Sequence, residues 1–174
     1  MNTKTRIIRL LDAIKADFPR RKQNAEQLMK QMGLDESYDL EIAAPAPVVA
    51  VPTFAAKVTH PPSPMLKARF EYAGSWRMGH QVWLNAEEMG LYMRRKSIRQ
   101  YHRALRDHWE GSAPMRFSDD RLTLFGITEG VPENRIYLVW NNLNVEPEVW
   151  DYHGMEMETF KNLELFLQWR LERE

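Results

Sequence analysis

The sequence predicts an α+β fold: a mixed or antiparallel sheet flanked by helices, preceded by an N-terminal helical hairpin and a Pro-rich linker. Three observations predict it. Apolar residues recur at helical spacing near the N-terminus, six of the ten prolines fall within residues 43–64, and a succession of strand, strand, helix, three strands and helix follows. A sheet with helices packed beside it is the natural solution for that order. We therefore expect a helical hairpin over residues 1–34, a linker over 35–64 and an α+β domain over 65–174.

The N-terminal segment is predicted to form two short helices. Apolar residues spaced by three and four define the first, over about residues 5–18, and Pro19 ends it or begins the next turn. The second helix covers residues 22–32, with Gly33 placed as its C-terminal cap. Two short helices bury little surface alone, so we expect the pair to dock on the main domain or on another chain.

Residues 43–64 favour neither helix nor central strand, because proline removes backbone donors and fixes an extended conformation. The composition indicates a semi-rigid linker. Two alternatives remain open. The segment is a recognition sequence for a proline-reading groove, or apolar residues such as Val51 and Phe54 attach part of it to the domain.

The next elements are two strands and a long helix. Residues 67–73 alternate apolar and polar, Gly74 and Ser75 indicate a turn, and residues 80–84 supply a partner strand. Asn85 is a good N-cap for a helix over residues 86–109. Three further strands are expected over residues 121–130, 135–141 and 146–153, followed by a final helix from about residue 159.

The helix over residues 86–109 carries a basic stripe. Residues 94–106 contain six Lys and Arg and no Asp or Glu, and Arg95, Arg99 and Arg103 lie away from the apolar arc that includes Ile98 and Leu105. Such a stripe is either a solvated surface or a docking face for an acidic protein or for phosphates.

An acidic cluster near the C-terminus and one tryptophan are further candidates for a partner-binding surface. The cluster contains Glu146, Glu148, Asp151 and Glu156, which are either solvated and capping residues or a mimic of nucleic-acid phosphates toward a basic partner. Trp76 lies in a polar segment next to Arg77, so it is either a core residue or an exposed interface anchor.

The chemical motifs of common enzymes are missing from the sequence. The chain has no Cys, no Gly-rich phosphate loop and no nucleophile elbow, and its five His are not spaced as a metal motif. We therefore predict no catalytic residues, no metal and no cofactor. The charged N-terminus does not resemble a signal peptide and no apolar run is long enough to span a membrane, so we expect a cytoplasmic protein with no membrane partner.

The run from Arg121 to Leu171 resembles the C-terminal half of SUKH superfamily domains, the Smi/Knr-type immunity and adaptor fold. The resemblance lies in the strand with Phe125 and Gly126, in the strand over residues 136–140, in residues 146–150 and in the closing helix. It covers about a third of the chain. It implies a non-enzymatic protein that binds a partner protein, such as a toxin or a component of a defence system, and it transfers no catalytic residues.

The resulting hypothesis is a protein-binding immunity or adaptor protein of a bacterial toxin or defence system. The alternative is a nucleic-acid-binding accessory protein that uses the basic N-terminal hairpin and the Arg stripe. The balance of 24 Lys and Arg against 24 Asp and Glu counts against that alternative, because nucleic-acid-binding domains are usually strongly basic. A third hypothesis, an enzyme that uses the acidic cluster with a distant His, lacks a supporting motif.

Overall fold

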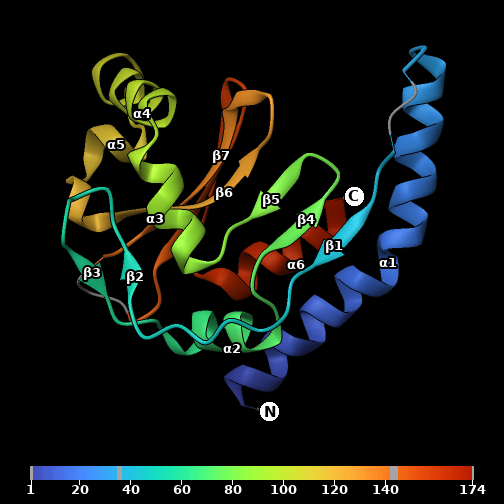
Figure 1. Ribbon diagram of the computed structural model, residues 1–174, viewed down its shortest axis with the longest axis horizontal. Coiled ribbons are helices and arrows are strands. Elements are labelled where there is room, and N and C mark those ends of the chain that lie inside the picture. The colour runs from blue at the N-terminus through green and yellow to red at the C-terminus, as the bar shows by residue number, and fades with distance from the viewer. Residues whose placement is uncertain (1, 35–36, 142–144, 174) are drawn as a thin grey trace.

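The main sheet is antiparallel at every pairing in the computed structural model, which describes residues 2–34, 37–141 and 145–173 (Figure 1). Seven strands of this part of the chain lie in the order β1-β4-β5-β6-β7-β8-β9. They are β1 (Leu40–Ile42), β4 (Trp76–Met78), β5 (Gln81–Trp83), β6 (Leu122–Thr128), β7 (Val131–Val139), β8 (Glu148–His153) and β9 (Glu156–Phe160). A second small sheet pairs β2 (Val51–Pro52) with β3 (Thr59–His60). The predicted α+β class is confirmed.

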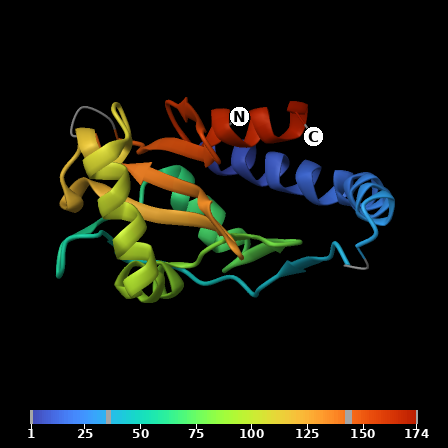
Figure 2. The same cartoon turned by 90° about the horizontal axis from the view of Figure 1, so that it is seen from above.

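Helices cover both faces of the sheet. They are α1 (Thr3–Gln31), α2 (Pro64–Tyr72), α3 (Ala86–Arg94), α4 (Lys96–His108), α5 (Ala113–Arg116) and α6 (Leu163–Arg173), with a 3₁₀ turn over Asp119–Arg121. α6 packs on β8 and β9, and α1 packs outside it against both α2 and α6. Figure 2 shows α1 and α6 side by side along one face, with α3 and α4 on the opposite side of the sheet. Among the described residues, no helix combines the length and apolar character needed to cross a bilayer.

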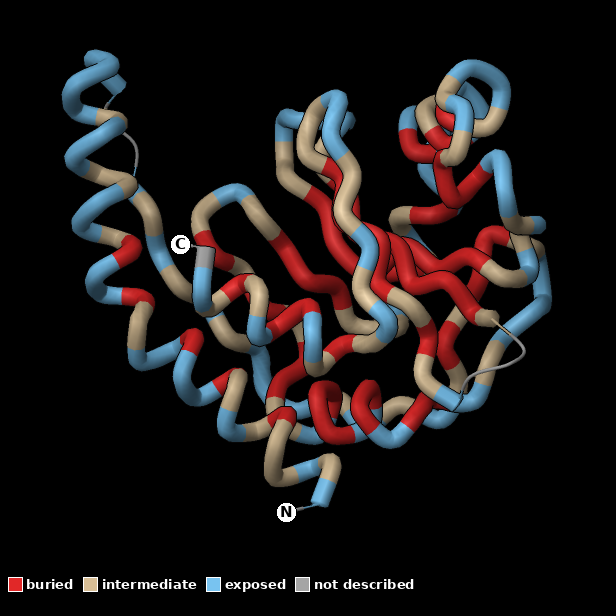
Figure 3. The backbone as a smooth tube through the Cα atoms, turned by 180° about the vertical axis from the view of Figure 1, so that it is seen from behind, coloured by how far each residue is buried: buried red, intermediate tan, exposed pale blue. Residues whose placement is uncertain are grey.

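Side chains alternate between two buried layers along the central strands. On β8, Trp150 and Tyr152 face α4 and α5, and the intervening Asp151 therefore faces α6. On the α6 face, the ring of Trp83 packs 5.7 Å from that of Phe166. Most of the buried residues are apolar, and the buried backbone in Figure 3 follows the sheet and the helices against it.

The sheet is a succession of tight hairpins. β4 and β5 pair from Met78 to Gln81, which leaves two residues for the turn, and Gly79 there adopts a φ of +55°. A Cβ atom at Gly79 would also lie 2.5 Å from the ring of Tyr38. Glycine is therefore required at this position both by the left-handed backbone and by the close approach of the aromatic ring.

The predicted N-terminal hairpin is wrong, because α1 is one helix from Thr3 to Gln31 with Pro19 inside it. Its buried stripe continues across the proline, from Ile14 and Phe18 to Arg21. The guanidinium of Arg21 donates to the carbonyl of Arg170 on α6 at 3.0 Å. These tertiary contacts on both sides of Pro19 offset the lost backbone hydrogen bond, and the helix bends about halfway along its length (Figure 1).

The segments that follow α1 also differ from the prediction. The linker expected over residues 35–64 contributes β1, β2 and β3, and Val51 and Phe54 lie fully in the core, so its apolar residues attach it to the domain. The strand expected over residues 67–73 is helix α2 instead. The hydroxyl of Ser63 caps this helix and Pro64 begins it, and these start signals outweigh the short alternation of apolar residues.

The C-terminal half follows the prediction more closely. The strand expected over residues 80–84 and the three expected over residues 121–153 are present as β5, β6, β7 and β8. The long helix over residues 86–109 is divided at Arg95, whose ψ of 136° is extended, into α3 and α4. Strand β9 was not predicted, and its formation places the start of the closing helix at Leu163.

Candidate binding surface

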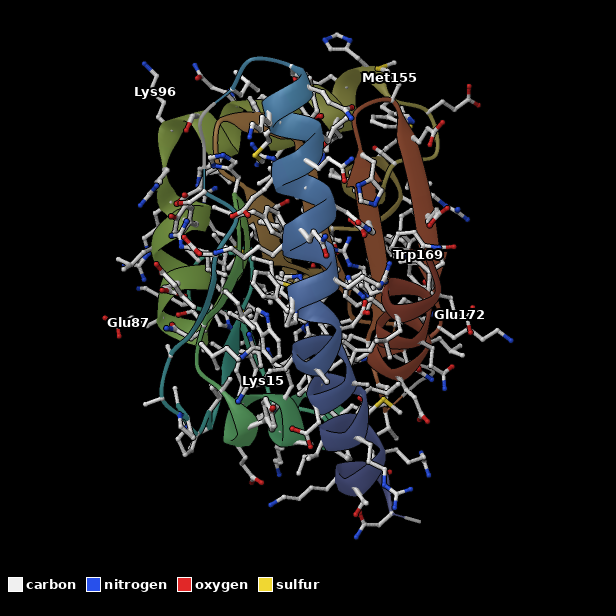
Figure 4. The ribbon with its side chains drawn as sticks, turned by 90° about the vertical axis from the view of Figure 1, so that its right-hand side faces the viewer. Lys15, Glu87, Lys96, Met155, Trp169 and Glu172 are labelled. Carbon is white, nitrogen blue, oxygen red and sulfur yellow. The ribbon has the colours of Figure 1, made fainter. Side chains whose placement is uncertain are left out.

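The break between α3 and α4 creates a basic corner. Arg95 occupies the break, and its guanidinium carbon stacks 3.7 Å from the ring centroid of Tyr92. Five basic residues around this corner and along α4 are exposed to solvent. They are Arg94, Arg95, Lys96, Arg99 and Arg103, which are called the α4 basic surface below. Figure 4 shows that Lys96 points away from the body of the protein.

The three arginines predicted as a stripe are all at the surface but have different surroundings. Arg99 donates to the carbonyl of Phe54 at 3.2 Å and lies one turn from Arg103 on the same face of α4. Arg95 precedes the first turn of α4 and lies beside Tyr92 and the β6–β7 hairpin. None of the three forms an ion pair with another described residue. Arg106, in contrast, is held by the carboxylate of Asp119 at 2.5 Å.

A pocket of about 440 Å³ lies between the α3–α4 corner and the β6–β7 hairpin. It is called the hairpin pocket below. Its walls combine apolar side chains with two arginines and the hairpin turn. The lining residues are Tyr92, Arg95, Ser97, Ile98, Ile127, Thr128, Glu129, Gly130, Val131, Pro132, Asn134 and Arg135.

A bulge in β7 positions the second arginine of this pocket. Ile127 pairs with Arg135 and Thr128 pairs with Val131, so three residues of β7 have no place in the register. Bulges commonly re-aim a side chain next to a functional site. Here Arg135 stacks 4.4 Å from the ring centroid of Tyr101, and its Nε donates to the carbonyl of Pro132 at 2.6 Å.

Arg135 is unusual because it is only 3% exposed and its Nη1 has no hydrogen-bond partner among the described residues. Burial lowers the pKa of its guanidinium by disfavouring the charged form. The buried Tyr137 acts against this shift, so the guanidinium faces the buried tyrosines as well as the pocket.

The single carboxylate of the hairpin pocket is already neutralised. Glu129 accepts hydrogen bonds from both terminal nitrogens of Arg77, at 2.5 and 3.2 Å. These bonds hold the pKa of the Glu129 carboxyl below its ordinary value. Glu129 also interacts with Arg95, and Glu133 of the hairpin interacts with Arg135. With Arg77 counted, three arginines face these two carboxylates, so the pocket keeps an excess of positive charge.

Beneath α4, His102 joins a buried network instead of facing the surface. Its Nδ1 lies 3.2 Å from the hydroxyl of Tyr137, its Nε2 lies 3.0 Å from Oδ1 of Asp119, and Phe54 stacks on the ring at 3.8 Å between centroids. Burial lowers the pKa of His102 to about 4. The imidazole is therefore neutral at pH 7 and acts as a hydrogen-bonding core residue.

The predicted acidic cluster does not form one surface. Oε1 of Glu146 accepts from the backbone N–H of Met65 at 3.0 Å, and Oε2 of Glu148 accepts from the indole of Trp150 at 3.0 Å. Glu146 therefore accepts a hydrogen bond from a free N–H group in the first turn of α2, in agreement with the capping alternative. Glu156 is exposed at the start of β9.

Two predicted partner-binding residues are wrong because they lie in the interior. Asp151 is 1% exposed on the α6 face of β8, 3.0 Å from Nε2 of His153. Trp76 is also 1% exposed and packs between Tyr72 and Trp83. Neither side chain is available to a partner, and Trp76 is the core residue that the alternative supposed.

Sequence reasoning missed the hairpin pocket. Arg135 was a detectable signal, since it precedes the apolar run of residues 136–140 that forms a buried strand. The bulge and the pairing of Arg77 with Glu129, 52 residues apart, leave no such pattern. In the described residues, no group of three or more His, Asp or Glu side chains is arranged to hold a metal ion.

Comparison with known proteins adds no relative: no protein-family model, no curated protein and no solved structure matches the chain. The SUKH resemblance therefore stays a prediction.

Proposed function

We propose that this chain is a non-enzymatic protein-binding module that holds an acidic partner on the α4 basic surface. The finer form of the proposal is a cytoplasmic immunity or adaptor protein that neutralises or tethers a component of a bacterial toxin or defence system. One observation carries the proposal: five exposed basic residues lie together without an acidic partner in the described part of the chain.

Several basic residues elsewhere on the protein have acidic partners. On α1, Lys4 contacts Glu71 at 2.6 Å, Arg20 contacts Asp17 at 2.8 Å and Lys22 contacts Asp39 at 2.6 Å. A surface that concentrates unpaired charge of one sign attracts a partner of opposite sign and speeds its association. The α4 basic surface concentrates five basic residues within positions 94–103, and this concentration favours it as the docking face.

Two of the histidines that could do acid–base chemistry are engaged inside the fold, whereas His108 is exposed and lines a separate pocket with Glu110. His102 is buried among Tyr137, Asp119 and Phe54, and His153 is held by the buried carboxylate of Asp151. The hairpin pocket, which is open to the basic corner, is lined by two arginines and a neutralised carboxylate but by no histidine. This chemistry suits binding of a charged group more than proton transfer.

A protein partner is favoured over nucleic acid by the surroundings of the basic surface. The chain as a whole has no net charge, and Leu91 and Val131 beside the corner are 53% and 38% exposed. Protein interfaces combine such apolar contacts with a charged rim. Nucleic-acid binding is kept as an outcome of the experiment.

The test is affinity capture from cells that express the chain naturally, using wild-type protein and the double variant Arg99→Glu/Arg103→Glu. We expect one stoichiometric protein on the wild type and its loss on the variant. Raising the salt from about 0.1 M to about 1 M, which shortens the Debye length from about 10 Å to about 3 Å, should also release it.

The matched control is Lys15→Glu/Lys67→Glu, which makes the same change in charge at exposed positions of α1 and α2. The control should keep the partner, and thermal unfolding should show that both double variants fold. Loss of the partner in the control, or its retention in the α4 variant, would contradict the proposal.

Capture of nucleic acid in place of a protein would support the alternative function. If the captured protein arrests growth and this chain restores it, the immunity form is supported; tethering without toxicity supports an adaptor.

A further inference from the structure

We infer that the hairpin pocket is a carboxylate-binding site that takes a carboxylate with an adjacent apolar side chain. The inference rests on the proposed function in one respect, since it assigns the chemical group that an acidic partner inserts beside the α4 basic surface. Three features of the pocket support this inference: the start of α4, the buried Arg135 and the apolar walls.

The first feature is the uncapped N-terminus of α4. The first hydrogen bond within this helix is donated by Arg99 to the carbonyl of Arg95 at 3.0 Å, so the N–H groups of Lys96, Ser97 and Ile98 precede the helical ladder. Arg95 at the N-cap offers no side-chain acceptor, and the first turn contains no acidic residue. Ser97 and Ile98 both line the pocket. Donors at a helix N-terminus and the positive end of the helix dipole favour an anion.

The second feature is the guanidinium of Arg135. It is nine-tenths buried or more, it lines the pocket, and its Nη1 has no acceptor within the described structure. Nη1 itself is enclosed, so a carboxylate in the pocket is attracted by the positive charge of the guanidinium and reaches this nitrogen only if the side chain shifts. Arg95 lies at the opposite wall and adds a second positive charge, while Glu129 is withdrawn from competition by Arg77.

The third feature is the apolar part of the wall. Ile98, Ile127 and Val131 line the pocket together with the ring of Tyr92. A volume of about 440 Å³ exceeds what a carboxylate alone would fill and falls within the range of small-ligand sites, roughly 300–1,000 Å³. The ligand therefore has an apolar side chain next to its anionic group. A protein can supply this combination either at its C-terminus or with an acidic side chain beside an apolar residue.

The experiment titrates the folded, full-length protein with small probes, followed by the backbone amide signals of Ser97 and Ile98 in ¹⁵N-resolved NMR. N-acetyl-leucine represents a chain terminus, and N-acetyl-aspartyl-leucinamide represents an acidic side chain. Each has a neutral match, N-acetyl-leucinamide and N-acetyl-asparaginyl-leucinamide. We expect saturable shifts with at least one of the two carboxylates and none with either neutral match. The probe that binds more tightly shows whether the partner's carboxylate comes from a chain terminus or from an acidic side chain.

Ser97→Glu is the decisive variant, because it places a competing carboxylate in the first turn of α4. It should weaken probe binding at least tenfold without lowering the melting temperature, since an acid at a helix N-terminus stabilises the helix. Gln100→Glu is its control: it adds the same charge to an exposed position of α4 outside the pocket and should leave binding within about twofold, because solvent screens it. Arg135→Gln should also lose binding, with folding checked by the spectrum of the variant.

The inference would be overturned by equal shifts with the carboxylates and their neutral matches, by unchanged binding in Ser97→Glu, or by shifts with inorganic phosphate alone. None of these results bears on the Arg99→Glu/Arg103→Glu capture experiment. Arg99 and Arg103 lie outside the pocket lining, so that double variant should still bind the probe. The two experiments therefore show separately whether the pocket binds a carboxylate and whether the α4 basic surface binds the partner.

Discussion

Each face of the sheet contains a histidine 3.0 Å from an aspartate, but the two pairs are buried in opposite ways. On the α4 face, the His102 side chain is 6% exposed and its partner Asp119 is 33% exposed. On the α6 face, His153 is 32% exposed and its partner Asp151 is 1% exposed. The same two residue types at the same distance therefore have different access to water.

The direction of the histidine pKa follows from this difference. Loss of hydration dominates at His102 and lowers its pKa to about 4, although Asp119 acts against that shift. At His153 the carboxylate of Asp151, 3.0 Å away, outweighs partial burial and raises the pKa. Glu158 adds to this effect and Arg170 opposes it. In these two pairs, the more buried partner decides whether the histidine favours or disfavours the proton.

The largest expected effect comes from removing the ring that shields His102. Phe54→Ala should lower the free energy of unfolding by about 3–5 kcal/mol, since Phe54 is fully buried. It should also raise the pKa of His102 toward its ordinary value, because the stacked ring keeps water away. Denaturant unfolding and the NMR titration of the imidazole measure the two effects.

The control for Phe54→Ala is Phe166→Ala, a deletion of the same size on the α6 face. It should cost a similar free energy but leave the titration of His102 unchanged. If Phe54→Ala does not fold, Phe54→Leu provides the same test with a smaller loss of stability. A pKa of His102 that stays near 4 in a folded Phe54 variant would show that burial by this ring is not the cause.

The next effect is a loss of stability in mild acid that depends on His102. The folded pKa of about 4 lies below the unfolded value of about 6.5, so the unfolded state binds the proton first. The contribution of this group to the free energy of unfolding should fall by about 2 kcal/mol between pH 7.5 and pH 5. Urea unfolding of wild type and His102→Gln at the two pH values measures it. The variant should lose less stability in acid than wild type, and equal losses would contradict the burial argument.

Much of this fold could be predicted from the sequence, and the errors have local physical causes. The strands over residues 121–153 were predicted correctly because aromatic and β-branched residues occur between clear turn signals. Pro19 suggested a helix end, but it faces solvent while residues on both sides of it pack on α6 and α2. The strand misassigned to residues 67–73 had an alternation of only a few residues, against which Ser63 and Pro64 start a helix.

The candidate site could be predicted only in its exposed part. Arg95, Arg99 and Arg103 stand out because their segment contains no acidic residue, and the structure leaves them at the surface. The role of Arg135 depends on a bulge, on the ring of Tyr101 and on a salt bridge formed by other residues. Asp151 was misjudged because an acidic residue in a strand gives no sign of which face it occupies unless the register is known.

The smallest expected effect is the pH dependence at His153, which should have the opposite sign to that at His102. Its folded pKa is raised, so its stabilising contribution is fully present below the unfolded value of about 6.5 and is lost as the pH rises through the folded pKa. Relative to wild type, His153→Gln should therefore lose more stability at pH 5.5 than at pH 8.5. His102→Gln should show the reverse, and urea midpoints of the three proteins at both pH values make the comparison. If both variants shifted in the same direction, the pattern of burial would not be what separates the two pairs, and the buried carboxylate of Asp151 would need another partner to explain its place in the core.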